Sequence, residues 1–301
     1  MEQRTQSCRG NERIVRLAAA AVLLTPGAAF AQASPFDTGA NSLVTFALTI
    51  ATPVAVLIVI ALAIAAAVVI VSGHALAQAK APEPDYTLSF NAGAVTDYRY
   101  RGISQSRLNP ALQGGVDFAH KNGFYLGAWG STIKWIKDIP GGDASVEVDL
   151  YGGYKGTVGD IGYDVGVLTY QYPSNNLNPS ANTTEIYGAV TAGPATLKYS
   201  HATSNLFGFA NSKNSYYLDL SAGFDLGDGW SVTPHIGYQS VKNNSAFSYT
   251  DYSVTVGKDL GNGLSASAAL VGTDADKALY VTPAGKFTGR TALVLGIKYS
   301  F

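Results

Sequence analysis

The sequence has almost no cysteine and few charged residues. Its single cysteine, Cys8, lies in a leader-like segment of the 301-residue chain, so the mature protein is expected to carry no thiol. That excludes disulfides and cysteine-based metal sites. Charged residues make up 14% of the chain, whereas soluble domains carry about a quarter. The net charge of −1 gives no basic excess, so nucleic acid is not an expected partner.

Two apolar, export-like segments occupy the first eighty residues. Arginines precede an apolar run, and Ala31-Gln32-Ala33 offers a small-residue cleavage site, which predicts a signal peptide over 1–33. A second apolar segment, 34–80, contains a run without charge, 43–71, that is long enough to cross a bilayer as a helix. Three interpretations stay open for it: an uncleaved inner-membrane helix, an unusual second leader, or a fused or misassigned front end. We favour the third and expect a helix without catalytic groups.

Beyond the linker near residue 81, apolar residues alternate with polar ones up to the C-terminal end. Leu218, Leu220 and Phe224 share one face of a run, opposite Asp219 and Ser221. A period of two with one apolar face predicts a half-buried strand. Runs of about nine to eleven residues suit tilted strands that cross lipid. The twelve runs are 86–98, 111–119, 123–132, 145–155, 161–171, 184–192, 195–202, 214–225, 230–240, 249–259, 263–272 and 290–301.

The connections between the runs alternate between long and short along the chain. Even-numbered strands are followed by short turns such as Lys121-Asn122 and Gly261-Asn262, and odd-numbered strands by long loops such as 99–110 and 273–289. Short turns on one rim and long loops on the other are typical of outer-membrane barrels. The sequence therefore predicts an all-β transmembrane barrel over 81–301, with twelve antiparallel up-and-down strands and both termini in the periplasm.

Aromatic residues gather at the ends of these runs, as two interfacial belts require. Ordinary strand propensity of Tyr and Phe is the alternative explanation. The expected belt on the turn side consists of Tyr86, Phe118, Phe124, Tyr154, Tyr163, Phe224 and Trp230, and the belt on the loop side of Tyr98, Tyr170, Tyr172, Tyr216 and Tyr238.

The last run ends with apolar residues on one face and a terminal phenylalanine. Tyr299 and Phe301 close this alternation. The pattern resembles the C-terminal signal read by the outer-membrane assembly machinery. That machinery and outer-membrane lipid are therefore the expected partners, in the outer membrane of a Gram-negative bacterium.

The stretch Thr96-Asp97-Tyr98-Arg99-Tyr100-Arg101-Gly102-Ile103-Ser104-Gln105 begins the first long loop, and Glu147-Val148-Asp149-Leu150-Tyr151-Gly152-Gly153-Tyr154 follows further on. Over residues 86–301 the chain resembles the TorF-type porin family, described as conserved hypothetical outer-membrane β-barrel proteins. The resemblance implies an outer-membrane barrel with a pore, and no substrate or functional residue.

The alternation places several charged residues on the inner face of the predicted barrel, and these residues are the candidates for lining its lumen. On the first run, Asp97, Arg99 and Arg101 lie opposite the face of Tyr98, which we expect to contact lipid. Facing acids and bases could set the ion selectivity of a pore, or form an internal salt-bridge network that holds a filled barrel together. Twelve strands predict a pore that is small or partly plugged. The acids of matching parity are Asp117, Glu147, Asp149, Asp164 and Asp219.

A porin for passive diffusion of ions or small hydrophilic solutes is the predicted function. A barrel enzyme of the lipase or protease type is one alternative, because His235 shares a face with Ser231 and Thr233, but no GxSxG elbow occurs. A non-conducting surface or binding barrel with Asn- and Ser-rich loops is another. The histidines His120 and His201 are dispersed, so no metal site, cofactor or catalytic residue is predicted, and the sequence does not indicate the oligomeric state.

Overall fold

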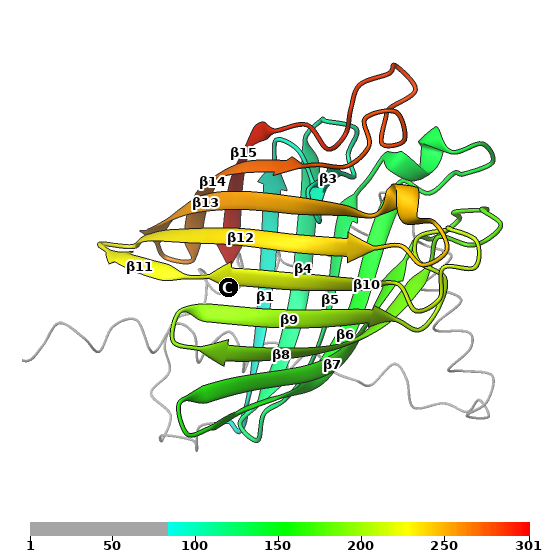
Figure 1. Ribbon diagram of the computed structural model, residues 1–301. Helices are drawn as coiled ribbons and strands as arrows, with labels where there is room; N and C mark the ends of the chain where they lie inside the picture. Colours follow the sequence, from blue (N-terminus) through cyan, green and yellow to red (C-terminus); the bar gives the residue numbers. More distant parts are fainter. Residues whose placement is uncertain (1–83) are drawn as a thin grey trace, which may run out of the picture.

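The computed structural model describes residues 84–301, which form a closed antiparallel β-barrel (Figure 1). The expectations for the signal peptide over 1–33 and the apolar segment 34–80 lie outside the described residues. Within 84–301, no helix is both long and apolar enough to cross a membrane. The only helical pieces of this part are two short 3₁₀ turns, η2 (Trp135–Asp138) and η3 (Ser245–Phe247), both in long loops.

Twelve strands make up the barrel, as the alternation predicted. One of them is interrupted at Gly223, so its two parts carry separate labels, and a register shift near Asp225 disturbs its pairing. The strands are β1 (Tyr86–Val95), β4 (Ala111–His120), β5 (Phe124–Thr132), β6 (Val146–Val158), β7 (Ile161–Gln171), β8 (Thr183–Ala192), β9 (Ala195–Ala202), β10 (Tyr216–Ala222) with β11 (Phe224–Gly227), β12 (Trp230–Ser240), β13 (Tyr249–Gly261), β14 (Leu264–Thr273) and β15 (Ala292–Ser300).

Each strand pairs with its neighbour along the chain, and the first strand pairs with the last. In this closing pair, Asn91 lies opposite Ser300 and Val95 opposite Gly296. Two backbone hydrogen bonds extend the pair to Phe301: its amide donates to Phe90 at 3.0 Å, and the Phe90 amide donates to Phe301 at 2.8 Å. Closure leaves no long free edge, which removes the template for edge-to-edge aggregation.

Short turns and long loops lie on opposite rims, which confirms the predicted sorting by parity. Both ends of the barrel lie on the short-turn rim. The turn Asn262-Gly263 joins β13 to β14 with positive φ at both residues, the geometry of a tight hairpin turn. A Cβ on Gly263 would lie 2.1 Å from the Ser300 carbonyl oxygen, so this position requires glycine.

Exposed large apolar side chains lie on eleven of the twelve strands, all except β1. Leu126, Leu150, Val165, Ile186 and Leu220, on five different strands, are all exposed. Monomeric soluble proteins rarely expose contiguous apolar patches above a few hundred Å². An apolar band around the whole barrel is what a lipid-facing surface requires.

Tyrosines fill the inside of the barrel because glycines on neighbouring strands leave them room. A Cβ on Gly127 would lie 2.6 Å from the ring of Tyr151, and a Cβ on Gly237 would lie 1.9 Å from the hydroxyl of Tyr217. A ring that covers a glycine restores packing at the gap left by the missing side chain. The high glycine content of the strands thus narrows the lumen with aromatic rings.

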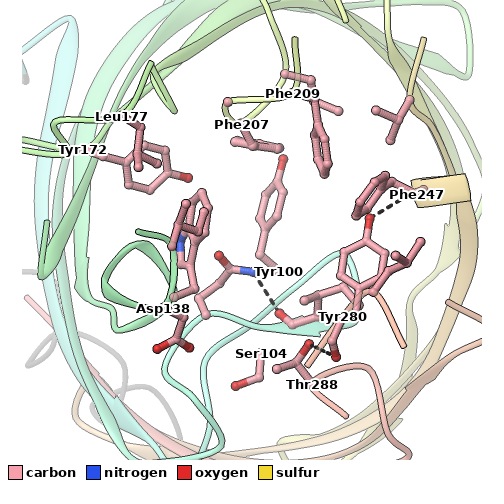
Figure 2. A pocket seen from close by; sticks show the side chains of 18 of the residues that line it. Tyr100, Ser104, Asp138, Tyr172, Leu177, Phe207, Phe209, Phe247, Tyr280 and Thr288 are labelled. Atoms are coloured by element: carbon pink, nitrogen blue, oxygen red, sulfur yellow. Dashed lines mark hydrogen bonds between the residues drawn. The ribbon is translucent and has the colours of Figure 1, made fainter. Parts of the chain in front are cut away.

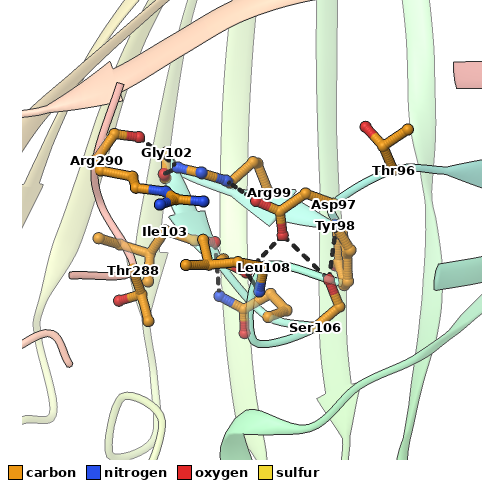
Figure 3. Close-up of polar contacts among 12 residues, drawn as sticks. Thr96, Asp97, Tyr98, Arg99, Gly102, Ile103, Ser106, Leu108, Thr288 and Arg290 are labelled. Carbon is orange, nitrogen blue, oxygen red and sulfur yellow. Dashed lines mark hydrogen bonds and ion pairs between the residues drawn. The ribbon is translucent and has the colours of Figure 1, made fainter. Parts of the chain in front are cut away.

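The first strand is shorter than predicted, since it ends at Val95 and not at residue 98. The chain then turns into the barrel and forms the small hairpin of β2 (Arg99–Tyr100) and β3 (Ile103–Ser104) before β4 begins. We call residues 97–108 the plug, because contacts of this segment reach several walls of the barrel. Figure 3 shows its polar contacts inside the strands.

The aromatic belts are only partly as expected. Phe124, Tyr154, Phe224, Trp230 and Tyr238 are exposed on the exterior. Three of the expected loop-side residues are instead buried, namely Tyr98, Tyr170 and Tyr172. Tyr98 belongs to the plug, Tyr170 has the inward parity of β7, and Tyr172 lies beyond the end of that strand. The expectation that Tyr98 faces lipid is therefore wrong.

Candidate functional site

The tip of the plug carries an arginine that spans the lumen to two walls. Arg101 and Gly102 both have positive φ and form the turn between β2 and β3. The Arg101 guanidinium donates to Glu185 of β8 at 2.7 Å and to Gln239 of β12 at 2.6 Å. It also lies over the ring of Tyr217, 4.3 Å from the ring centroid. These contacts hold a backbone conformation that otherwise costs about 1–2 kcal/mol for a residue with a side chain.

A second ion pair stabilises the plug from within. Arg99 Nε donates to Asp97 at 2.5 Å, and its Nη1 donates to the carbonyls of Gly102 and Arg290 (Figure 3). The other oxygen of Asp97 accepts hydrogen bonds from the hydroxyls of Ser104 and Ser106, at 2.5 and 3.1 Å. Asp97 therefore organises the hairpin, and the strong bonds to its charge explain why a carboxylate is buried here.

Burial and charge act in opposite directions on the Arg101 side chain. Burial lowers its pKa, but attraction to Glu185 and hydrogen bonding to that carboxylate outweigh burial and leave the pKa above its ordinary value. The side chains of Arg101 and Glu185 are only 6% and 1% exposed. A pair this deeply buried is costly to break on one side only, because the remaining charge has no water around it.

Two lumen acids lie beside the plug without a basic partner. Glu147 accepts a hydrogen bond from the hydroxyl of Tyr98 at 2.9 Å. Burial and the nearby carboxylates of Glu147 and Asp149 raise the pKa of the Tyr98 hydroxyl. Among residues 84–301, neither acid makes an ion pair within 4.0 Å, and each keeps one buried oxygen without a hydrogen bond.

Nearer the short-turn rim, tyrosine hydroxyls bind two further acids of the wall. Tyr151 donates to Asp117, and Tyr125 donates to Asp164 at 2.6 Å. The hydroxyl of Tyr125 also bonds that of Tyr187. Tyr187 in turn packs under the ammonium of Lys198, 3.9 Å from its ring centroid. These groups give the interior a polar lining of hydroxyls and carboxylates.

His235 lies in a polar cluster and not in a catalytic pair with Ser231. Its Nε2 is 2.7 Å from Asp219 and 3.1 Å from the Tyr217 hydroxyl, and its Nδ1 is 3.6 Å from Asp251. In residues 84–301, no hydrogen bond joins this imidazole to the Ser231 hydroxyl. An activated nucleophile needs such a bond to its base. Nor does this part of the chain contain a cluster of three or more metal-ligating residues.

Three hollow spaces follow one another along the barrel. The mouth cavity, about 760 Å³, lies among the long loops and is walled by aromatic rings (Figure 2). The central cavity, about 610 Å³, is lined by Arg101, Lys198 and His235. The turn-side cavity, about 730 Å³, is lined by polar groups such as Asn91 and Ser231. Tyr100 of the plug lines both the mouth cavity and the central cavity, so the plug separates them.

Every lumen residue proposed from parity lies inside the barrel, but the plug residues do so for a different reason. Asp97, Arg99 and Arg101 are inside because the loop folds inward, and not because the strand continues. Further polar groups of the lumen were missed, although strand parity identifies them from their outward neighbours. Glu185 and Asp251 precede the exposed residues Ile186 and Tyr252 on their strands. The other missed groups are Lys198, Tyr217 and Gln239.

Comparison with known proteins identifies one family and several solved structures that are similar in shape but distant in sequence. The family model described as "Bacterial protein of unknown function (Gcw_chp)" matches residues 78–301. It leaves the narrower TorF-type resemblance as a prediction. No curated protein matches the sequence.

Several solved structures have a similar shape, and two of those reported below are porins by their titles. A KdgM porin is 10% identical, with a TM-score of 0.49 over 71% of this chain and 99% of that chain. A NanC porin is 12% identical, with a TM-score of 0.46 over the same shares. OccAB3 of Acinetobacter baumannii is 14% identical, with a TM-score of 0.36 over 73% of this chain and 65% of that chain.

Proposed function

The chain belongs to the Gcw_chp family of bacterial proteins of unknown function, and we propose that it is a channel of the Gram-negative outer membrane. It passes ions and small hydrophilic solutes by passive diffusion. The observation that supports this function is the contrast between the two surfaces of the wall. Leucines, valines and isoleucines cover the outside, whereas hydroxyls, carboxylates and two large cavities lie inside. A polar lining in an apolar wall is the arrangement of a water-filled pore.

The plug limits what can pass. It lies at the level of Glu147 and Glu185, and its Tyr100 contributes to the boundary between two cavities. Solutes must therefore be small or must displace the plug. Selectivity then depends on the width and the lining charge at this level, without a cofactor or energy coupling.

The charge of the lining favours cations. Asp117 and Asp164 have the inward parity of their strands and make no ion pair with a basic residue among residues 84–301; only tyrosine hydroxyls bind them. Lys198 of the central cavity makes no ion pair with an acid of residues 84–301, and its ammonium lies over a tyrosine ring. Rings of carboxylates lower the energy of a cation in a narrow pore.

Insertion into the outer membrane depends, in this proposal, on the last strand. The ring of Phe301 stacks on Phe90 of the first strand and on Tyr299, at 5.8 and 5.5 Å between centroids. The terminal residue thus lies at the closing seam. A signal placed there can be read by the assembly machinery before the seam forms.

Planar bilayer recording tests the proposal. The full chain is expressed, extracted from the membrane fraction of the cells and added to a bilayer. We expect discrete current steps that are linear in voltage. Protein that keeps its barrel, judged by circular dichroism, and yet gives no steps would contradict the channel and favour a non-conducting binding barrel. Extract from cells without the gene is the control.

A further inference from the structure

From the mouth cavity we infer a second property of this protein: the long loops form a binding site for an uncharged molecule with a flat aromatic ring system. The site lies above the plug, at the entrance to the proposed conduction path, and its occupant does not have to pass through the lumen. Its volume of about 760 Å³ is within the usual range of small-molecule pockets. It draws residues from the plug and from five long loops, so closure of the barrel is needed to assemble it.

Eight of the 25 residues that line the cavity are aromatic. Figure 2 shows Tyr172 and Phe207 on one side of the space and Phe247 and Tyr280 on another. They belong to two groups of edge-to-face rings, with Tyr172 next to Trp135 and Tyr280 next to Phe247. Such pairs fix ring orientation and leave faces for an offset or edge-to-face contact with a further ring.

Several polar groups of the wall are already used within the protein, whereas the buried indole N–H of Trp135 has no hydrogen-bond partner among residues 84–301. The hydroxyl of Tyr280 donates to the Phe247 carbonyl at 2.7 Å, and that of Thr288 donates to the Tyr280 carbonyl at 2.9 Å (Figure 2). Gln239 accepts from Arg101 and donates to the backbone. The one charged lining group, Asp138, is paired with Arg107. A ligand with many hydroxyls would have to find a partner for each of them on this largely aromatic and aliphatic wall, and a buried unpaired polar group costs about 1–3 kcal/mol.

The distribution of exposed apolar side chains also points to a ligand. In the described part of the chain, the large apolar residues that are exposed lie on the strands, where lipid covers them, with three exceptions in the loops. The exceptions are Ile139, Leu279 and Val281, which are 39%, 38% and 39% exposed. All three line the mouth cavity. Lipid does not account for them, whereas an apolar ligand would cover them.

Coumarin, an uncharged planar aromatic compound, is a suitable probe. Its binding is measured by equilibrium dialysis against the full chain in lipid nanodiscs, with empty nanodiscs as the blank for partition into lipid. We expect one saturable site per chain and no competition by sucrose. Binding no greater than in empty nanodiscs, or displacement of coumarin by sucrose, would overturn the inference.

Two substitutions in one loop give the matched comparison. Leu279→Asp places a charge on the cavity wall and should weaken coumarin binding at least tenfold. Ala278→Asp adds the same charge at the adjacent exposed residue, which does not line the cavity, and should leave binding unchanged. Equal effects of the two variants would contradict a site in this cavity. Bilayer conductance is recorded separately, because loss of coumarin binding and loss of conductance test different claims.

Discussion

Replacement of Arg101 by alanine should free the plug. The change removes the guanidinium that joins the tip of the plug to Glu185 and Gln239. Breaking one side of a buried ion pair costs about 3–5 kcal/mol. The substitution raises the free energy of the plugged state only, because Glu185 regains contact with water once the plug leaves. Since each 1.4 kcal/mol is a factor of ten, the ratio of displaced to plugged channels should rise about a hundredfold to a few thousandfold.

Single-channel recording is the assay for this change. Arg101→Ala should spend much more time in a state of higher conductance than the unmodified protein. Arg107→Ala is the matched control, since its pair with Asp138 is partly exposed and such pairs contribute about 0–1 kcal/mol. The double variant Arg101→Met/Glu185→Gln removes both charges and should shift the equilibrium less than Arg101→Ala. Identical dwell times in Arg101→Ala and the unmodified channel would refute the role given to this ion pair.

Two further predictions concern the plug turn and the closing seam. Gly102→Ala should lower the melting temperature more than Gly141→Ala: both positions have positive φ, but only at Gly102 would the new Cβ lie within 4 Å of other groups, 2.3 Å from a Thr273 methyl. Equal melting temperatures would show that the plug tip does not press on the wall. Phe301→Ala should reduce the folded protein in outer-membrane fractions several-fold, because it removes the stacked terminal ring, whereas Leu293→Ala on the same face should not. Equal amounts of the two variants on immunoblots would exclude a special role for the terminal residue.

The barrel could be predicted from the sequence because lipid imposes a simple rule on every strand. Each crossing must alternate apolar and polar residues, and Leu218, Leu220 and Phe224 show that rule without any tertiary information. The lengths of the connections then showed which strand ends lie on the short-turn rim and which lie on the long-loop rim. The break at Gly223 was not foreseen, since alternation continues across it.

The plug could not be predicted in the same way. Residues 96–100 continue the alternation of the first strand, so parity placed Tyr98 on the lipid side. The inward turn depends on partners far away in the sequence, such as Glu147 for Tyr98 and Glu185 for Arg101. The residue type does not predict the positive φ at Arg101 either, because arginine has no preference for that conformation. A long-range hydrogen bond and a long-range ion pair hold this part of the fold, whereas the local alternation of apolar and polar residues determines the strands.

The reversal potential of single channels under a KCl gradient tests the central claim most directly, namely that the acid-lined lumen is the path of the solute. In the proposed channel, Asp117 and Asp164 give the lining acids without a basic partner among residues 84–301, so the zero-current potential should have the sign that opposes K⁺ flow down its gradient. Lys198→Glu, which adds an acid in the central cavity, should increase that potential. A potential of zero, or one of the opposite sign, would contradict conduction through this lumen.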